Sequence, residues 1–215
     1  MSLRVYLILR GELMVGEFSP GEPISLRTLA RRLGTSAMPV REAVNRLIAE
    51  QALQMMPNRQ VIVPFMSRHK FEELWRVRQM LESMAAEGAC AHLDDGVLEE
   101  LEHLHMRAME ALQQAAPRPI LSTNKDFHFR LYQASHSEVL LPMIEGLWMQ
   151  MGPFMRLSLE AKTARWDGSH HVEILEALRT GDAVAVRRAV HEDISSMAEI
   201  IVEIDAFDVS RKRVS

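Results

Sequence analysis

Hydrophobic and polar positions in the first third of the chain predict three short helices followed by a hairpin. The predicted elements are helices over 3–15, 26–33 and 37–53 and a hairpin whose turn is Pro57-Asn58-Arg59. Ser25 and Ser36 stand directly before the second and third helices, where a hydroxyl can cap free backbone N–H groups, and Gly34 ends the second helix. Helix, tight turn, helix and hairpin in this order make up a winged helix-turn-helix domain.

From residue 67 onward the pattern changes to long helices without a strand signal. The predicted helices span 67–93, 96–114, 119–135, 137–159, 168–180 and 182–205. The fold is therefore predicted to be mainly α. We expect a winged helix-turn-helix domain over 1–66, an all-helical antiparallel bundle over 67–208 that binds an effector and dimerises, and a mobile polar tail over 209–215.

The net charge of −4 hides a difference between these two parts. Residues 1–66 contain eight arginines, no lysine and five acidic residues, so this part carries +3 and the remainder −7. A basic domain on an acidic body is expected if only that domain approaches the phosphates of DNA.

The predicted third helix has two distinct sides. Its apolar side consists of Val40, Ala43, Val44 and Leu47. Its outer side consists of Ala37, Met38, Arg41 and Asn45. In a winged helix-turn-helix this helix enters the major groove, where an arginine can pair with guanine. The alternative is a solvated amphipathic helix without a nucleic-acid partner.

Residues 19–53 resemble the operator-binding segment of the GntR family of regulators. The matching positions are Pro20-Gly21, Leu33-Gly34, Ser36 and Pro39-Val40-Arg41-Glu42-Ala43. The resemblance implies that Arg27 and Arg41 contact the operator and that Ser36 binds a phosphate. Ala37 stands where the family usually has arginine, which predicts an altered or weaker operator. Arg59 at the hairpin tip is a candidate for a wing contact, with a solvated arginine as the alternative.

Polar side chains stand on the apolar sides of three helices in the second part. Asn124 and His128 lie one turn apart on one of them, and His171 and Asp193 lie on the other two. A buried carboxylate needs a cation, a donor network or water. From spacing alone, a metal site and a metal-free hydrogen-bonded network are equally consistent with these four residues.

Most of residues 70–205 resembles the all-helical ligand-binding domain, the FCD type, of the FadR branch of the GntR family. The matching motifs are Asn124-x-x-Phe127-His128-x-x-Leu131, His171-x-x-Ile174-x-x-Ala177 and Gly181-Asp182. The resemblance implies a divalent metal, with zinc as the first choice and manganese or nickel as alternatives. Its ligands would be Asn124, His128, His171 and Asp193. Because Asn124 replaces the usual aspartate and Asp193 the usual histidine, this ligand set is harder than a three-histidine site.

The same resemblance points to Arg78 as a cavity residue that pairs with a small organic-acid effector. A salt bridge to Glu82, one helical turn away, is its alternative role. Six methionines are predicted to fill the core or to line an adaptable ligand cavity: Met80, Met84, Met143, Met149, Met151 and Met155.

Together these features predict a ligand-responsive transcriptional regulator that binds a pseudo-palindromic operator in double-stranded DNA as a homodimer, whether as a repressor or as an activator. The single cysteine, Cys90, and an N-terminal apolar run too short for a membrane span favour a cytoplasmic location without membrane contact. An enzyme is not expected. The main rival is a metal-dependent hydrolase or lyase at His128, His171 and Asp193, for which no motif supplies a general base. The second rival is an interaction scaffold with a degenerate DNA-binding domain, since Ala37 replaces an expected arginine.

Overall fold

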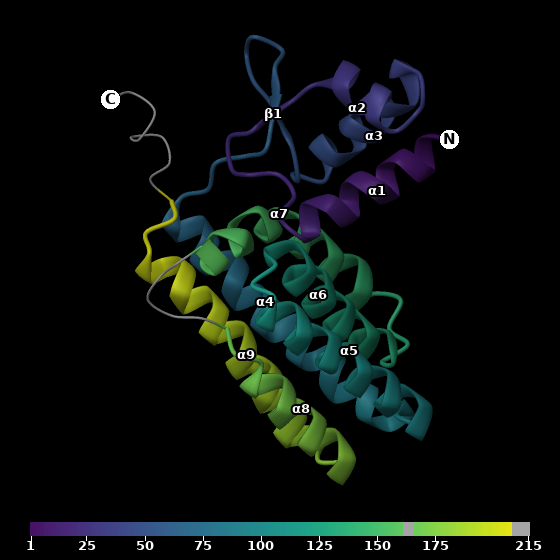
Figure 1. The fold of residues 1–215 in the computed structure, drawn as a ribbon, viewed down its shortest axis with the longest axis vertical. Helices are drawn as coiled ribbons and strands as arrows, with labels where there is room; N and C mark the ends of the chain where they lie inside the picture. The colour runs from purple at the N-terminus through teal and green to yellow at the C-terminus, as the bar shows by residue number, and fades with distance from the viewer. Residues whose placement is uncertain (161–165, 208–215) are drawn as a thin grey trace.

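The N-terminal part folds as the predicted winged helix-turn-helix (Figure 1). The computed structural model describes residues 1–160 and 166–207. The elements of this domain are α1 (Ser2–Met14), β1 (Pro23–Ile24), α2 (Leu26–Arg32), α3 (Ala37–Ala49), β2 (Gln54–Met55) and β3 (Val61–Ile62). β3 lies between β1 and β2 and pairs antiparallel with both. The predicted hairpin therefore gains a third strand, β1, which the sequence pattern did not predict.

The helix α3 is shorter than predicted. It ends at Ala49 rather than Leu53, because Gln51 adopts a left-handed φ of 60° and turns the chain toward β2. Leu53 still packs into the core, with 4% of its surface exposed. The predicted apolar side of α3 is buried against α1 and α2. Ser25 caps α2 by accepting a hydrogen bond from the Thr28 N–H.

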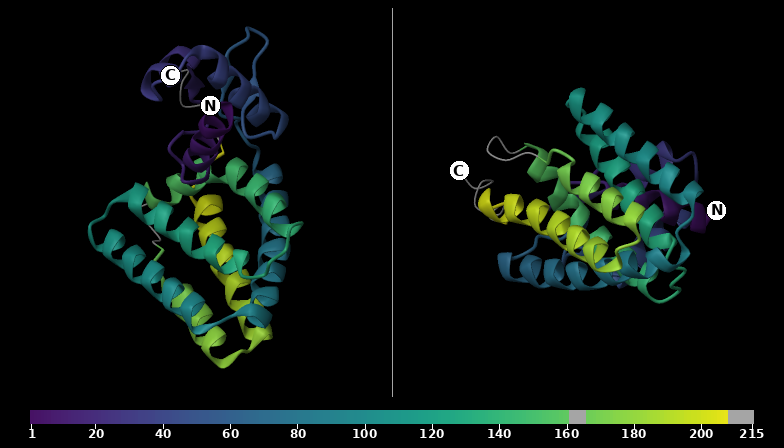
Figure 2. Two further views of the ribbon diagram at one scale, coloured as in Figure 1. Left: turned by 90° about the vertical axis from the view of Figure 1, so that its right-hand side faces the viewer. Right: turned by 90° about the horizontal axis from the view of Figure 1, so that it is seen from below.

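The second part is an all-helical bundle, which confirms the predicted fold class (Figure 2). Its elements are α4 (Arg68–Ala89), the 3₁₀ turn η1 (Cys90–His92), α5 (Asp95–Gln113), α6 (Pro117–Gln133), α7 (Leu140–Glu160), α8 (Ser169–Thr180) and α9 (Ala183–Glu203). The predicted helix boundaries differ from these by at most four residues. The side chains of Ser67, Asp94 and Asp182 cap α4, α5 and α9, which explains why these helices begin where they do.

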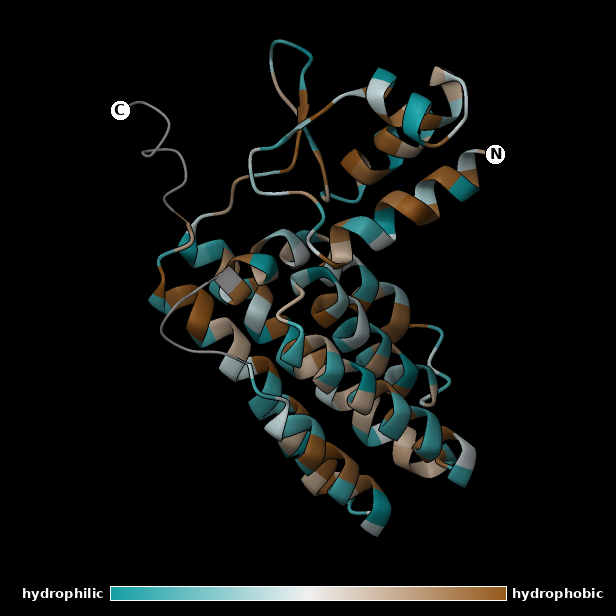
Figure 3. Cartoon of the chain, in the orientation of Figure 1, coloured by the Kyte–Doolittle hydropathy of each residue, from teal (hydrophilic) through white to brown (hydrophobic). Residues whose placement is uncertain are grey.

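Apolar and polar residues alternate along the helices of the bundle (Figure 3), and the buried apolar residues form its core. Leu101, Phe127 and Ile174 are fully buried there. Burying a side chain of this size stabilises the fold by about 1.5–3 kcal/mol. α9 packs against both α4 and α8, and α5 packs against α6.

The helix α7 joins the two domains, because α1 packs directly on it. A Cβ atom added to Gly152 would lie only 2.1 Å from the carbonyl oxygen of Leu13. Nearby, Arg10 Nη1 forms an ion pair of 2.6 Å with Glu145 Oε2. These contacts fix α1, and with it α3, against the bundle.

The predicted boundary between residues 66 and 67 falls in the segment between β3 and α4. The predicted tail, 209–215, lies outside the described residues. Over 1–160 and 166–207, no helix combines the length and apolar composition that crossing a membrane requires.

Candidate DNA-reading face and buried metal-ligand cluster

The predicted outer side of α3 is exposed. Met38 is 63% exposed, and Arg41 and Asn45 are exposed on the same side of the helix. Ser36 precedes the helix, but its hydroxyl makes no capping bond, so that hydroxyl is available to a phosphate oxygen. Arg27 is exposed on α2. Five of the predicted DNA contacts therefore lie on the surface of the helix-turn-helix.

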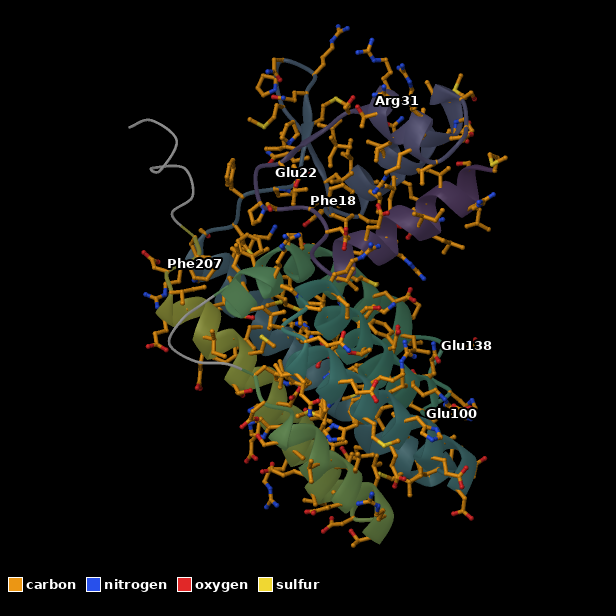
Figure 4. The ribbon with its side chains drawn as sticks, viewed as in Figure 1. Phe18, Glu22, Arg31, Glu100, Glu138 and Phe207 are labelled. Atoms are coloured by element: carbon orange, nitrogen blue, oxygen red, sulfur yellow. The ribbon has the colours of Figure 1, made fainter. Side chains whose placement is uncertain are left out.

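The arginines of the N-terminal domain divide into two groups. Ion pairs join Arg10 to Glu145, Arg32 to Glu12 and Arg46 to Glu50. Within the described part of the chain, no such pair is formed by Arg4, Arg27, Arg31, Arg41 or Arg59. Figure 4 shows Arg31 on the side of the domain that faces away from the bundle. Exposed arginines without an acidic partner favour contact with a polyanion.

Arg59 stands at the tip of the hairpin. Its φ of 64° is left-handed, and its N–H donates to the carbonyl of Met56 at 2.8 Å. Asn58 Oδ1 accepts a hydrogen bond of 3.0 Å from the Gln60 N–H. The turn is thus well defined and leaves the Arg59 side chain exposed, where a wing contact is predicted.

The four predicted metal ligands lie on three helices inside the bundle. Asn124 and His128 belong to α6, His171 to α8 and Asp193 to α9, and none is more than 5% exposed. His128 Nε2 lies 3.1 Å from Asp193 Oδ2 and 3.3 Å from His171 Nε2. One ligand atom from each of these three residues lies within 4.8 Å of the other two. Asn124 lines the same cavity as His128 and Asp193.

These separations match the spacing of ligands around one cation. Ligand atoms about 2.0–2.1 Å from zinc are about 2.8–3.4 Å from their neighbours in octahedral or tetrahedral geometry. Oδ1 of Asn124 and Oδ1 of Asp193 are buried and have no hydrogen-bond partner among the described residues. Such atoms are costly unless a cation or water satisfies them. Two imidazoles, an amide and a carboxylate therefore fit a divalent cation such as zinc, manganese or nickel.

Burial determines the charge of the cluster. Desolvation lowers the pKa of His171 to about 3, against the opposing effect of the Asp193 charge. Burial acts to raise the pKa of Asp193, but its bond to His128 and the nearby imidazoles outweigh this and lower that pKa to about 2. At neutral pH the cluster therefore contains a carboxylate and a neutral His171, which are the forms that bind a metal.

A hydrogen-bonded chain runs from His128 away from the cluster. His128 Nδ1 lies 3.1 Å from the Tyr132 hydroxyl, and that hydroxyl donates to Glu82 Oε2 at 2.7 Å. Glu82 also accepts bonds of 2.5 and 3.2 Å from the Arg78 guanidinium. Arg78 is 5% exposed, and its guanidinium carbon lies 4.4 Å from the ring centroid of Trp148. The alternative role expected for Arg78 is thus present, as a buried salt bridge.

A small cavity lies beside the cluster. Its polar lining consists of Arg78, Asn124, His128 and Asp193, and most of its apolar lining comes from α7 and α9. The space open to the centre of a water molecule is about 20 Å³, which is room for about one water. A single water fits this space, whereas an organic acid requires the lining side chains to move.

The six methionines predicted for the core or the cavity lie in different environments. Met151 and Met155 line the cavity, and Met149 is buried. Met80, Met84 and Met143 are 64%, 50% and 51% exposed. The prediction was wrong for these three, because an apolar residue type alone does not reveal which side of a helix is covered.

Comparisons with known proteins agree with both domains. The model for bacterial regulatory proteins of the GntR family matches residues 1–63, and the FCD domain model matches residues 73–196. The HTH-type transcriptional regulator McbR of Escherichia coli K12 is 30% identical over 207 residues, which cover 94% of this chain and 93% of McbR. This chain belongs to the GntR family.

Solved structures support the same arrangement of GntR and FCD domains. E. coli McbR/YncC matches with a TM-score of 0.89 at 30% identity, over 95% of this chain and 98% of that one. The E. coli K12 repressor RspR is 25% identical over 203 residues, which cover 94% of this chain and 89% of RspR. These relatives are named transcriptional regulators, in agreement with the prediction that this GntR-family chain is not an enzyme.

Sequence reasoning missed Tyr132 of the FCD domain and treated Glu82 only as a surface partner of Arg78. A weak signal was present, because Tyr132 follows His128 by four residues, as Glu82 follows Arg78. That spacing shows which side chains are neighbours on one helix. It does not show that α4 and α6 bring the two pairs together.

Proposed function

We propose that this GntR-family chain is a homodimeric repressor that binds a pseudo-palindromic operator and responds to a small carboxylate at a metal in its FCD domain. The observation that carries the proposal is the buried cluster of His128, His171 and Asp193 beside a cavity lined by Arg78. Buried polar atoms without partners are costly for a core that serves packing alone. Repression is proposed because RspR is named a transcriptional repressor.

Operator recognition is proposed for the exposed side of α3. Arg41 and Asn45 lie one turn apart, and their side chains suit guanine and adenine edges in the major groove. The flanking contacts would come from Arg27, Ser36 and Met38 around α3 and from Arg59 at the wing. Arginine and hydroxyl groups suit phosphates, and the methionine suits the methyl group of thymine.

The cation, with zinc as the first choice, would be held by Asn124, His128, His171 and Asp193. When bound, it supplies a Lewis acid to which an effector carboxylate can attach. Arg78 donates two bonds to Glu82, but among the described residues the partner of its Nη1 is the Met155 sulfur, at 3.7 Å. This N–H group is therefore the one that a carboxylate can take without displacing Glu82.

The helix α7 offers a route from the cavity to the DNA-reading domain. Trp148, Met151 and Met155 line the cavity, whereas Glu145 and Gly152 contact α1. Because the cavity has room for about one water, a carboxylate has to displace lining side chains. A shift of α7 would move α1 and α3, and so change the fit of two reading helices to half-sites about one turn of DNA apart.

A second copy of the chain is the proposed partner for the exposed side of α4. Val77, Met80 and Met84 are 41%, 64% and 50% exposed there. Together with Leu81, they are symmetric about the midpoint between positions 80 and 81. An antiparallel pair of α4 helices therefore places Val77 of each copy against Met84 of the other, as a two-fold interface requires.

Selection from random DNA tests operator binding, and a short pseudo-palindrome is the expected result. Operator affinity is then measured for zinc-loaded protein with and without mono-, di- and tricarboxylates. The variant His171→Asn should lose the response, while His170→Asn, at the half-buried neighbouring position on α8, should keep it. Recovery of no reproducible sequence, or an affinity that no carboxylate changes, would overturn the proposal.

A further inference from the structure

The series of hydrogen bonds from Arg78 to His128 has a direction, which is fixed by the chemistry of the groups at its two ends. A guanidinium can only donate hydrogen bonds, and a carboxylate can only accept them. Since Glu82 accepts from Arg78, the Tyr132 hydroxyl must donate its own proton to Glu82, across 2.7 Å. The oxygen of Tyr132 then faces His128 Nδ1 at 3.1 Å with lone pairs only. The proton in this last bond therefore belongs to His128 Nδ1.

We infer that Glu82 and Tyr132 are positioning residues that keep a proton on His128 Nδ1 and aim Nε2 at the cluster. Nε2 is the nitrogen that lies 3.1 Å from Asp193 Oδ2 and 3.3 Å from His171 Nε2. A cation needs a lone pair on this atom, and an acceptor behind the ring fixes both its orientation and the position of its proton. The inference rests on the proposed metal site and adds to it two residues that do not touch the cation.

Packing alone does not account for this arrangement. Glu82 and Tyr132 are fully buried, and Arg78 is 5% exposed. A buried ion pair is often no more stabilising than apolar residues of the same volume, so stability does not require a directed chain that ends on an imidazole. The other tautomer of His128 would leave Nδ1 and the Tyr132 oxygen facing each other without a proton between them. These hydrogen bonds therefore hold a proton on Nδ1, so the proton that Nε2 shares with Asp193 Oδ2 is the one that a cation would replace.

The two tyrosines of the chain provide a matched test. Tyr132→Phe removes only the hydroxyl that links Glu82 to His128. Tyr6→Phe removes a hydroxyl in the other domain, which bonds Glu50 at 2.9 and 3.0 Å. Competition with a chromophoric chelator measures the zinc Kd, which should rise about 10- to 100-fold in Tyr132→Phe and stay unchanged in Tyr6→Phe. Equal zinc affinities of the wild type and Tyr132→Phe would overturn the inference. Failure of the wild type to bind zinc would instead overturn the proposed metal site.

A second measurement determines whether Nδ1 of His128 carries a proton in the metal-free protein. Imidazole ¹⁵N NMR should show a protonated Nδ1 in the wild type. In Glu82→Gln the side-chain amide can donate to Tyr132, which then donates to His128, so Nδ1 should lose its proton. A merely structural role would leave the protonated nitrogen unchanged between the two proteins, and this result would overturn the inference whether or not zinc binds. Glu82→Gln also replaces Tyr132→Phe in the zinc titration if the latter does not fold.

Discussion

Replacing Gly152 with alanine adds one methyl group at the closest contact between the two domains. The new Cβ would lie 2.1 Å from the carbonyl oxygen of Leu13 and 2.6 Å from that of Met14. Ordinary contact begins at 3.4 Å, so α1 and α7 would have to separate by about 1 Å. Both oxygens belong to the backbone, so no side-chain rotation can relieve the overlap.

Two opposing effects determine how much Gly152→Ala changes the free energy of unfolding. Alanine stabilises a helix relative to glycine by about 0.5–1 kcal/mol. Overpacking a close contact costs about 1–3 kcal/mol. Gly146 is a matched control on the same helix, because a Cβ there would meet nothing within 4 Å. The helix preference is common to both substitutions, so Gly152→Ala should be less stable than Gly146→Ala by about 1–3 kcal/mol.

Urea unfolding followed by circular dichroism measures this difference, with the slope of the transition checked for each variant. Operator affinity should also change in Gly152→Ala, since α1 packs on α3. Equal stability of the two alanine variants would refute the close docking of α1 on α7. It would also remove the route by which the cavity is proposed to act on DNA.

Three further predictions concern DNA, metal and dimer contacts. Arg41→Ala should weaken specific operator binding by about 1–3 kcal/mol in a fluorescence anisotropy titration. Arg46→Ala is the control and should leave binding unchanged, because Arg46 pairs with Glu50. Equal losses of affinity in the two variants would contradict the assignment of Arg41 as a DNA contact. Zinc at 100 times its Kd should stabilise the protein by about 2.7 kcal/mol in thermal unfolding, and the effect should vanish in His171→Asn but persist in His170→Asn. Met80→Glu should yield monomers in analytical ultracentrifugation. The control Met106→Glu, at a position 50% exposed on α5, should stay dimeric. A dimeric Met80→Glu protein would argue against the proposed α4 interface.

The fold could be predicted where single residues carry a local signal. Caps, glycines and prolines set most helix boundaries within a few residues, and the apolar side of α3 follows from its 3.6-residue period. β1 has only two residues and exists because it pairs with β3, so it has no pattern of its own. The early end of α3 depends on the left-handed backbone conformation of Gln51, which cannot be predicted from a glutamine in the sequence.

The candidate site could be predicted only in part. Asn124 and His128 share one helix, so their proximity follows from spacing. The convergence of His171 and Asp193 on them depends on how α6, α8 and α9 pack; the apolar sides of these helices predicted that the residues point inward, and the family resemblance implied a shared metal. The burial of Arg78 and Glu82 also depends on tertiary packing, because the same spacing on an exposed helix would give a weak surface ion pair.

If the proposed regulation holds, the size of the cavity limits which ligands can act, because α7 both lines the cavity and contacts α1. A ligand that fits the existing space of about 20 Å³ leaves α7 where it is and has the same affinity for every arrangement of α1. Such a ligand cannot change operator binding, however tightly it binds. A carboxylate too large for the space has to displace lining side chains, and two of these, Met151 and Met155, lie on α7 next to Gly152, which contacts α1. Steric mismatch with the cavity would therefore supply the unequal affinity that the proposed regulation requires, and an effector should be recognised by its size as well as by its charge.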